Sequence, residues 1–151
     1  MRETLFNWLM PYVPGAAIVD LFSGSGALGL EALSRGATSA QFIELNKAAA
    51  DAIQHNLKLL EASSSKVHQQ TAQEYLRTVE PQSADIIFLD PPFEQQLHNA
   101  IIELIATQKL LRDGALIYIE KPQNQVLQVA SDWQLLKQKS SGQVDFLLFQ
   151  A

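Results

Sequence analysis

Residues 19–29 read VDLFSGSGALG, an apolar run that passes an acid and leads into a glycine-rich loop. Gly24, Gly26 and Gly29 fit the spacing G-x-G-x-x-G, whose glycines permit a tight turn and let a ligand approach the backbone at a helix N-terminus. The glycine spacing is a weak signal when it stands alone. Placed directly after a strand-like run, it predicts a nucleotide-type ligand site at the end of the first strand of an α/β sheet.

Strand-like runs and helical segments alternate along the chain. The strand-like runs are residues 16–22, 39–45, 65–70, 84–90 and 115–121. Residues 46–60 and 97–111 carry apolar side chains near helical spacing, and Asn46 is a suitable N-cap for the first of these helices. This alternation predicts right-handed βαβ units and a parallel sheet covered by helices on both faces.

The last part of the chain has a different pattern. Residues 133–139, WQLLKQK, and residues 143–150, QVDFLLFQ, read as two strands joined by a tight turn. We therefore expect a mostly parallel seven-stranded sheet that ends in an antiparallel hairpin. The chain has 151 residues, of which 47% are hydrophobic, which suits one well-cored α/β domain over residues 1–151.

Composition excludes several classes of function. No apolar stretch approaches the roughly 18 residues of a membrane span, and Glu3 and Asn7 interrupt the region where a signal peptide would be continuous. We therefore expect a cytoplasmic protein without a membrane partner. The chain has no cysteine, which excludes disulfides and thiolate catalysis. His55, His68 and His98 lack the spacing of metal ligands, so we also expect no metal site.

Two acids end the first two strand-like runs, where α/β sheets bind their ligands. Glu44 lies twenty residues after Gly24, at a position where a carboxylate can accept hydrogen bonds from a ribose. These features suit a nicotinamide dinucleotide and S-adenosylmethionine equally, because both contain adenosine. Asp20 favours S-adenosylmethionine, since its carboxylate would attract an ammonium or sulfonium group and repel a pyrophosphate. The chain also leaves no room for a dehydrogenase substrate domain.

The fourth strand-like run ends in Asp90, which is followed by Pro91, Pro92 and Phe93. Proline ends ladder hydrogen bonding and keeps the preceding residue extended, so the acid should lie at an exposed strand end. Together with the glycine loop and the FIELN stretch, this DPPF motif resembles the amine-methylating members of the class I S-adenosylmethionine-dependent methyltransferases.

The chain resembles more closely the bacterial 16S rRNA guanine-N2 methyltransferase family, the RsmD family. The stretches that carry this likeness are RETLFNWL (2–9), LFSGSGALGLEALSRGA (21–37), DIIFLDPPF (85–93), ALIYIE (115–120) and GQVDFLLFQ (142–150). The likeness spans almost the whole chain. It implies a Rossmann-like class I methyltransferase fold, S-adenosylmethionine as the cofactor, and the N2 amine of a guanine in 16S rRNA as the acceptor.

The resemblance also implies roles for individual residues. The cofactor residues that it implies are Asp20, Phe22, Gly24, Gly26, Glu44, Leu45, Thr71, Ala72 and Asp90. Thr71 and Ala72 would lie near the adenine, although HQQTAQEY lacks the acid that related methyltransferases often carry there. The catalytic residues that it implies are Asp90, Pro91, Pro92 and Phe93.

The chemistry of an exocyclic amine explains the DPPF motif. The amine of guanine is conjugated with its ring, so its lone pair is poorly nucleophilic until acceptors hold the amino hydrogens in a pyramidal geometry. Asp90 offers one acceptor and the Pro91 carbonyl, fixed in direction by the two prolines, offers a second. Phe93 offers a flat face on which a base removed from its helix can stack.

The chain departs from the family pattern at its start. Members of the RsmD family usually carry a further basic segment before RETLFNWL that would contact RNA, and we expect such a segment upstream of this chain. The formal charge of −5 is consistent with this, since it argues against a self-sufficient nucleic-acid binder. The expected partner is 16S rRNA in the assembled small ribosomal subunit, and we expect the chain to act as a monomer.

Two alternative functions stay open at this point. An adenine-N6 DNA methyltransferase shares the DPPF-type motif, but it would normally need a target-recognition domain, for which 151 residues leave no space. A noncatalytic α/β interaction module would keep the nucleotide fold without the chemistry. The presence of Asp90 beside Gly24, Gly26 and Glu44 argues against that module.

Overall fold

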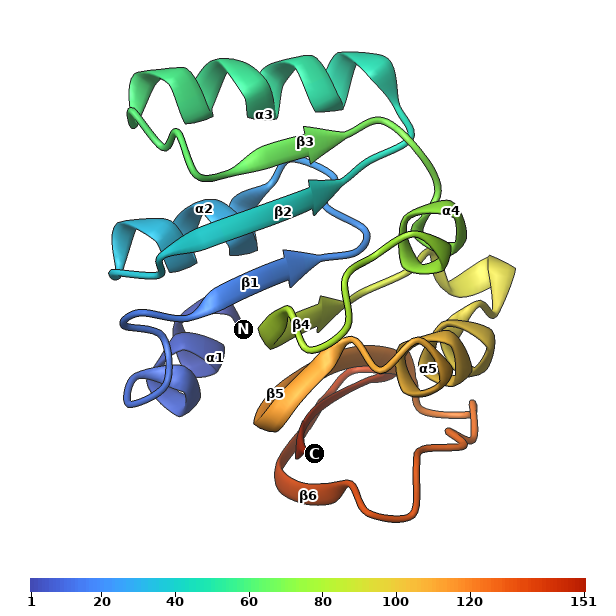
Figure 1. Ribbon diagram of the computed structural model, residues 1–151. Coiled ribbons are helices and arrows are strands. Elements are labelled where there is room, and N and C mark those ends of the chain that lie inside the picture. Colours follow the sequence, from blue (N-terminus) through green and yellow to red (C-terminus); the bar gives the residue numbers. More distant parts are fainter.

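The computed structural model describes residues 1–151 and contains one seven-stranded sheet (Figure 1). The strands are β1 (Ala17–Asp20), β2 (Ser39–Ile43), β3 (Lys66–His68), β4 (Ala84–Leu89), β5 (Leu111–Pro122), β6 (Gln134–Ser141) and β7 (Val144–Gln150). Their spatial order is β3-β2-β1-β4-β5-β7-β6, in which the first five are parallel and β7 is antiparallel to both of its neighbours. The prediction of a mostly parallel seven-stranded sheet with a C-terminal antiparallel hairpin is confirmed.

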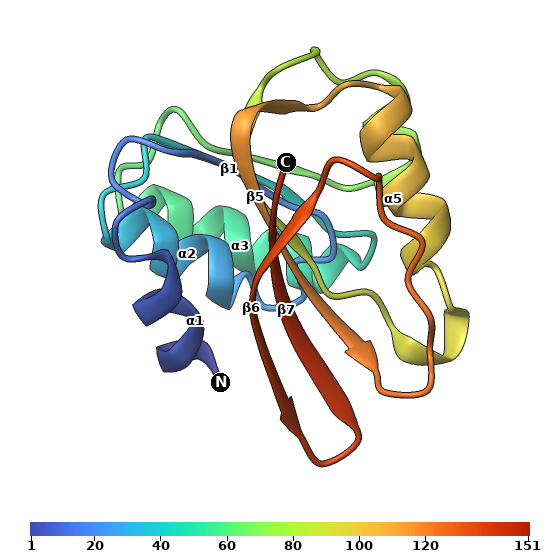
Figure 2. The ribbon, with the colours of Figure 1, turned by 90° about the horizontal axis from the view of Figure 1, so that it is seen from below.

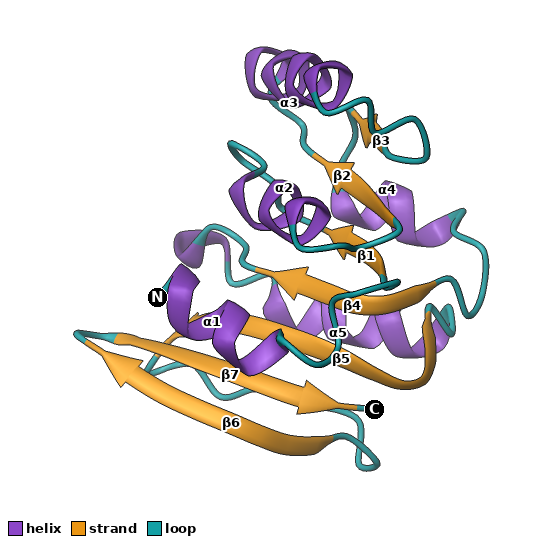
Figure 3. Cartoon of the chain, turned by 90° about the vertical axis from the view of Figure 1, so that its left-hand side faces the viewer, coloured by secondary structure: helices purple, strands orange, loops and turns teal.

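Helices cover both faces of the sheet, as predicted. They are α1 (Arg2–Leu9), α2 (Ala27–Ser34), α3 (Lys47–Leu59), α4 (Ala72–Arg77) and α5 (His98–Thr107), with a 3-10 turn η1 (Phe93–Gln95). One face packs against α1, α2 and α3, and the opposite face packs against α4 and α5 (Figures 2 and 3). None of these helices is both long enough and apolar enough to span a membrane.

The apolar run of β4 is explained by burial on both of its faces. Ile86 and Phe88 point into the core formed with α1, α2 and α3, whereas Ile87 and Leu89 point into the core formed with α4 and α5. All four side chains are at most 1% exposed. A strand buried in this way has no polar face, so the acid that follows it, Asp90, lies where the chain leaves the core.

Two helix starts follow local capping rules. The Asn46 side chain accepts a hydrogen bond from the Ala49 N–H at 3.0 Å, which confirms the predicted N-cap of α3. The six-residue helix α4 was not predicted. It begins with a reciprocal capping box between Thr71 and Glu74, and the T-x-x-E spacing that forms this box is visible in the sequence.

The predicted helix over residues 97–111 is wrong at its end. Helix α5 ends at Thr107, and Leu111 already begins β5, four residues before the predicted strand start at 115. Lys109 ends the helix in a left-handed conformation, with φ of 53°. Apolar residues 110 and 111 fit the periodicity of a helix and of a strand equally, so the pattern alone could not separate the two.

Gly29 sets the distance between α2 and the sheet. It is buried, and a Cβ added at this position would overlap the ring of Phe42 on β2. We expect Gly29→Ala to lower the free energy of unfolding by about 1 kcal/mol or more, because overpacking a filled core is destabilising. Urea unfolding would measure this, with Ser25→Ala, at an exposed position in the loop before α2, as the control. Equal stability of the two variants would contradict the packing role.

Candidate active site

A cavity of about 590 Å³ lies at the carboxyl ends of β1, β2 and β4. β2 and β3 lie on one side of β1, and the chain then crosses over so that β4 lies on the other side of β1. Open α/β sheets bind ligands where the strand order reverses in this way. The predicted cofactor residues that line the cavity are Phe22, Gly24, Glu44, Leu45, Thr71 and Ala72. The predicted catalytic residues Asp90, Pro91, Pro92 and Phe93 line it as well. The structure thus brings the cofactor and amine candidates into one cavity.

Glu44 is oriented by two backbone donors. One carboxylate oxygen, Oε1, accepts the Gly24 N–H at 2.7 Å, and Oε2 accepts the Asn46 N–H at 2.8 Å. These bonds connect the end of β2 to the glycine loop after β1. Each oxygen of an ionised carboxylate can accept more than one hydrogen bond. Both oxygens therefore remain able to accept from a ribose hydroxyl.

The first two glycines of the loop have different surroundings. Gly24 and Gly26 both have left-handed backbones, with φ of 56° and 80°, which strain any other residue. No atom lies within 4 Å of the Cβ position of Gly24, so the backbone there is open to the cavity that it lines. Gly26 does not line the cavity, and its Cβ position is 2.9 Å from Cγ1 of Ile53 on α3. The cofactor contact predicted for Gly26 stays a prediction.

Asp20 ends β1 but does not line the cavity. It is only 3% exposed, and burial raises the pKa of its carboxyl group to about 7. The Gly29 N–H opposes this rise in pKa, whereas the negative charges of Asp90 and Glu44 add to it. Near neutral pH, Asp20 is therefore divided between its protonated and ionised forms. A cation in the cavity would favour the ionised form. Because Asp20 does not line the cavity, its predicted attraction for a cationic cofactor stays a prediction.

Thr71 and Ala72 line the cavity where α4 begins. The Thr71 hydroxyl accepts the Glu74 N–H at 3.1 Å, and the Glu74 carboxylate accepts the Thr71 N–H at 3.0 Å. This capping box uses the N–H and one hydroxyl lone pair of Thr71, and it leaves the hydroxyl hydrogen free to donate. The adenine contact predicted for this segment stays a prediction.

The DPPF segment carries two possible acceptors on residues that line the cavity. The Pro92 carbonyl accepts the Gln95 N–H at 3.3 Å, whereas the Pro91 carbonyl accepts no hydrogen bond from the chain. The Asp90 carboxyl group is half-buried on the same wall, and burial raises its pKa to about 7, with a further rise from the Glu120 carboxyl group. The half-buried Phe93 lies with its ring centroid 6.1 Å from that of His98.

Sequence reasoning missed several residues of the site. The cavity is also lined by Leu21, Ser23, Ile43, Gln70, Gln95 and Leu97. Of these, Ser23 holds the loop in place, since its hydroxyl donates to the Asp20 carbonyl at 2.9 Å. Glu120, at the carboxyl end of β5, was also missed, although the strand-end argument applied to Glu44 and Asp90 would have found it.

Sheet order and site together define the class of the protein. Five parallel strands continue into an antiparallel hairpin, a glycine loop follows β1, an acid follows β2, and DPPF follows β4. This is the fold of the class I S-adenosylmethionine-dependent methyltransferases.

Comparisons with known proteins identify the family. A family model described as conserved hypothetical protein 95 matches residues 1–150. The chain is 41% identical over 153 residues to ribosomal RNA small subunit methyltransferase D of Haemophilus influenzae, and the match covers 99% of this chain and 79% of that relative. The protein of the same name from Escherichia coli is 41% identical over 151 residues, covering 99% and 76%. The chain therefore belongs to the RsmD family.

Solved structures agree with this assignment. The yhhF protein from Escherichia coli superimposes with a TM-score of 0.93 at 41% identity, and the match covers 99% of this chain and 84% of that one. An RNA methyltransferase from Salinibacter ruber, solved with S-adenosyl-L-homocysteine, has a TM-score of 0.73 at 14% identity over 99% of this chain and 88% of that one. The second likeness concerns the fold alone.

Proposed function

We propose that this chain transfers a methyl group from S-adenosylmethionine to the exocyclic N2 amine of a guanine in 16S rRNA. The observation that carries the proposal is that two consecutive cavity-lining residues offer acceptors: Asp90 has its carboxyl group, and the Pro91 carbonyl accepts no hydrogen bond from the chain. Relatives named ribosomal RNA small subunit methyltransferase D support rRNA as the substrate. We propose further that the chain acts as a monomer on the assembled small subunit, in the cytoplasm.

The cavity suits S-adenosylmethionine in size and in chemistry. Its volume of about 590 Å³ falls within the roughly 300–1,000 Å³ of small-molecule sites. Glu44 offers acceptors for the ribose hydroxyls, and the open backbone at Gly24 permits close approach. Asp20, at the end of β1 behind the cavity wall, provides a nearby acidic group that would favour a cation. When bound, S-adenosylmethionine supplies an electrophilic methyl group on a cationic sulfur.

The DPPF residues prepare the amine for attack. Asp90 and the Pro91 carbonyl would each accept one amino hydrogen, which pyramidalises the nitrogen and frees its lone pair from conjugation. Positive charge develops on the nitrogen during attack, so the interaction with an anionic Asp90 strengthens toward the transition state. Phe93 would hold the flipped base by stacking.

Methylation of unmodified small ribosomal subunits tests the function. We expect N2-methylguanosine at one position of 16S rRNA, identified by nucleoside mass spectrometry and primer extension, only when both this chain and S-adenosylmethionine are present. Parallel reactions with naked 16S rRNA test the need for the assembled particle. Methylation of adenine N6 in DNA would instead support the alternative function, an adenine-N6 DNA methyltransferase. Cofactor binding without methylation of either substrate would support the noncatalytic module.

Phe93→Ala should weaken capture of the flipped base by about 1–3 kcal/mol, because the stacking surface is lost. The rRNA concentration that gives half-maximal single-turnover rate should rise accordingly, while affinity for S-adenosylmethionine stays unchanged. Phe93→Tyr keeps the ring and serves as the matched control. If Phe93→Ala and Phe93→Tyr saturate with the same rRNA concentration, Phe93 does not stack on the substrate base.

A further inference from the structure

Glu120 lies beside Asp90 at the ends of two neighbouring parallel strands. Phe88 pairs with Tyr118, and Leu89 pairs with Ile119. The next positions in this register are Asp90 and Glu120. Because side chains alternate along a strand, both point to the face that carries Phe88 and Tyr118, which pack on α1, α2 and α3. The two side chains are therefore neighbours on adjacent strands, and the negative charge of Glu120 acts on Asp90.

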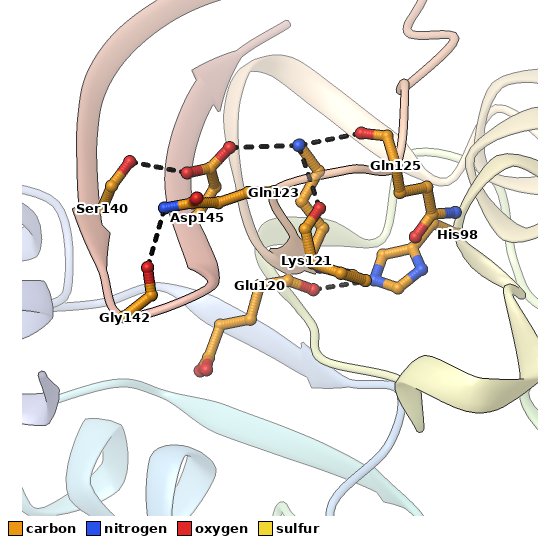
Figure 4. Close-up of polar contacts among 9 residues, drawn as sticks. His98, Glu120, Lys121, Gln123, Gln125, Ser140, Gly142 and Asp145 are labelled. Carbon is orange, nitrogen blue, oxygen red and sulfur yellow. Dashed lines mark hydrogen bonds and ion pairs between the residues drawn. The ribbon is translucent and has the colours of Figure 1, made fainter.

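The backbone around Glu120 is fixed from the opposite side. The Glu120 carbonyl oxygen lies 2.7 Å from Nε2 of the buried His98, at the start of α5 (Figure 4). The next residue, Lys121, is 8% exposed, and its ammonium group donates to Asp145 Oδ2 at 3.1 Å and to the Gln125 carbonyl at 2.8 Å. The Glu120 side chain points away from this network in Figure 4. Lys121 is therefore already neutralised by Asp145 and does not pair with Glu120.

The surroundings favour a proton on the carboxyl pair near neutral pH. Burial is the largest cause of the raised pKa of both Asp90 and Glu120, and the negative charge of Glu120 raises the pKa of Asp90 further. Other groups lie near the pair: Tyr118 lowers the pKa of Glu120, and the negative charge of Asp90 raises the pKa of Asp20 on β1. Two carboxyl groups in contact titrate as a unit and share the first proton that they bind.

We propose that Glu120 forms a carboxyl pair with Asp90 and that this pair takes the proton which the guanine amine loses on methylation. The inference rests on the proposed function. The amine nitrogen forms the N–C bond with its lone pair, and the C–S bond of the donor breaks with its electron pair left on sulfur. An N–H bond then breaks with its electron pair left on nitrogen, and the proton passes to Asp90. Glu120 shares that proton and, being half-buried, passes it on to water.

Direct titration of the carboxyl groups tests the pair in the cofactor-free protein. Carboxyl-carbon NMR on isotope-labelled aspartate and glutamate follows Asp90 and Glu120, assigned with Glu120→Gln and Asp90→Asn. We expect the Asp90 midpoint to fall by about one pH unit or more in Glu120→Gln, because the like charge is gone. The control Glu103→Gln, on the exposed side of α5, leaves the midpoint unchanged. An Asp90 midpoint that is the same in wild type and Glu120→Gln would overturn the pair.

The pH dependence of single-turnover methylation tests the use of the pair. The wild-type rate should rise with pH as the pair loses its last proton. In Glu120→Gln this rise should move to lower pH, and the maximal rate should fall roughly tenfold, because one carboxylate replaces the shared acceptor. If the rate of Glu120→Gln rises over the same pH range as that of wild type and reaches the same maximum, proton acceptance by the pair is overturned. Absence of rRNA methylation by wild type would instead refute the proposed function and the catalytic use of the pair. The titration experiment would still show whether the carboxyl pair itself exists.

Discussion

Asp90→Asn is expected to lower the single-turnover rate of methyl transfer by roughly 10²–10³, by analogy with the loss of one preorganised electrostatic group. Asparagine keeps the size and one acceptor oxygen of the side chain but removes the negative charge. That charge matters most when positive charge develops on the amine nitrogen, so the loss should fall on turnover and leave cofactor affinity nearly unchanged. Asp90 is half-buried and lines the cavity directly.

The measurement is rapid-quench methylation of unmodified small subunits at saturating S-adenosylmethionine, with cofactor binding followed separately by calorimetry. Glu94→Gln is the matched control, because Glu94 is an exposed acid of the same loop that does not line the cavity. Its rate should equal that of wild type. A near-normal rate for Asp90→Asn would mean that DPPF only terminates β4, and the amine mechanism would have to be abandoned.

Glu44→Ala is expected to weaken S-adenosylmethionine binding by about 1.5–3 kcal/mol, the range for hydrogen bonds to charged groups. The structure adds a second reason for a large effect. The same carboxylate accepts the N–H groups of Gly24 and Asn46, so alanine also releases the glycine loop from the end of β2. Part of the loss should therefore appear as a more mobile loop in the cofactor-free protein.

Calorimetry with S-adenosylmethionine, S-adenosylhomocysteine and NADH measures the effect and the specificity. Asp51→Ala is the control, because Asp51 is an exposed acid of α3 that pairs only with Lys47, and such surface pairs contribute little. Hydrogen exchange at Gly24 and Asn46 separates lost ribose contacts from a loosened loop. Tight binding of NADH together with no binding of S-adenosylmethionine would refute the cofactor assignment.

The fold could be predicted from the sequence because the hydrophobic pattern of each segment agreed with the overall α/β architecture. The wholly apolar run of β4 predicted a strand buried on both faces, and the patterns of residues 133–139 and 143–150 predicted the C-terminal hairpin. The end of α5 was not readable, since residues 110 and 111 satisfy both periodicities. Helix α4 was readable in principle from its capping box, but six residues carry too few apolar positions to show a period.

The positions of the site residues at strand ends could be predicted from the sequence, but their hydrogen bonds and pKa values could not. Glu44 and Asp90 follow from their positions, whereas the bond from Glu44 to Gly24 exists only once β1 and β2 lie side by side. The raised pKa values of Asp20 and Asp90 depend first on burial, and burial at a strand end is set by the surrounding layers rather than by the local sequence. The proximity of Asp90 to Glu120 likewise depends on the register of β4 with β5.

The position of β7 has a consequence for synthesis of the protein. β7 lies between β5 and β6 in space but follows both in the chain. While a nascent chain has emerged only as far as β6, β5 has one unpaired edge and β6 has no strand to join, and such edges invite pairing with other chains. Arrival of β7 aligns Phe146 with Glu120 and Asp145 with Lys121. The edge of β5 that faces away from β4 is therefore paired only after residues 144–150 have been translated.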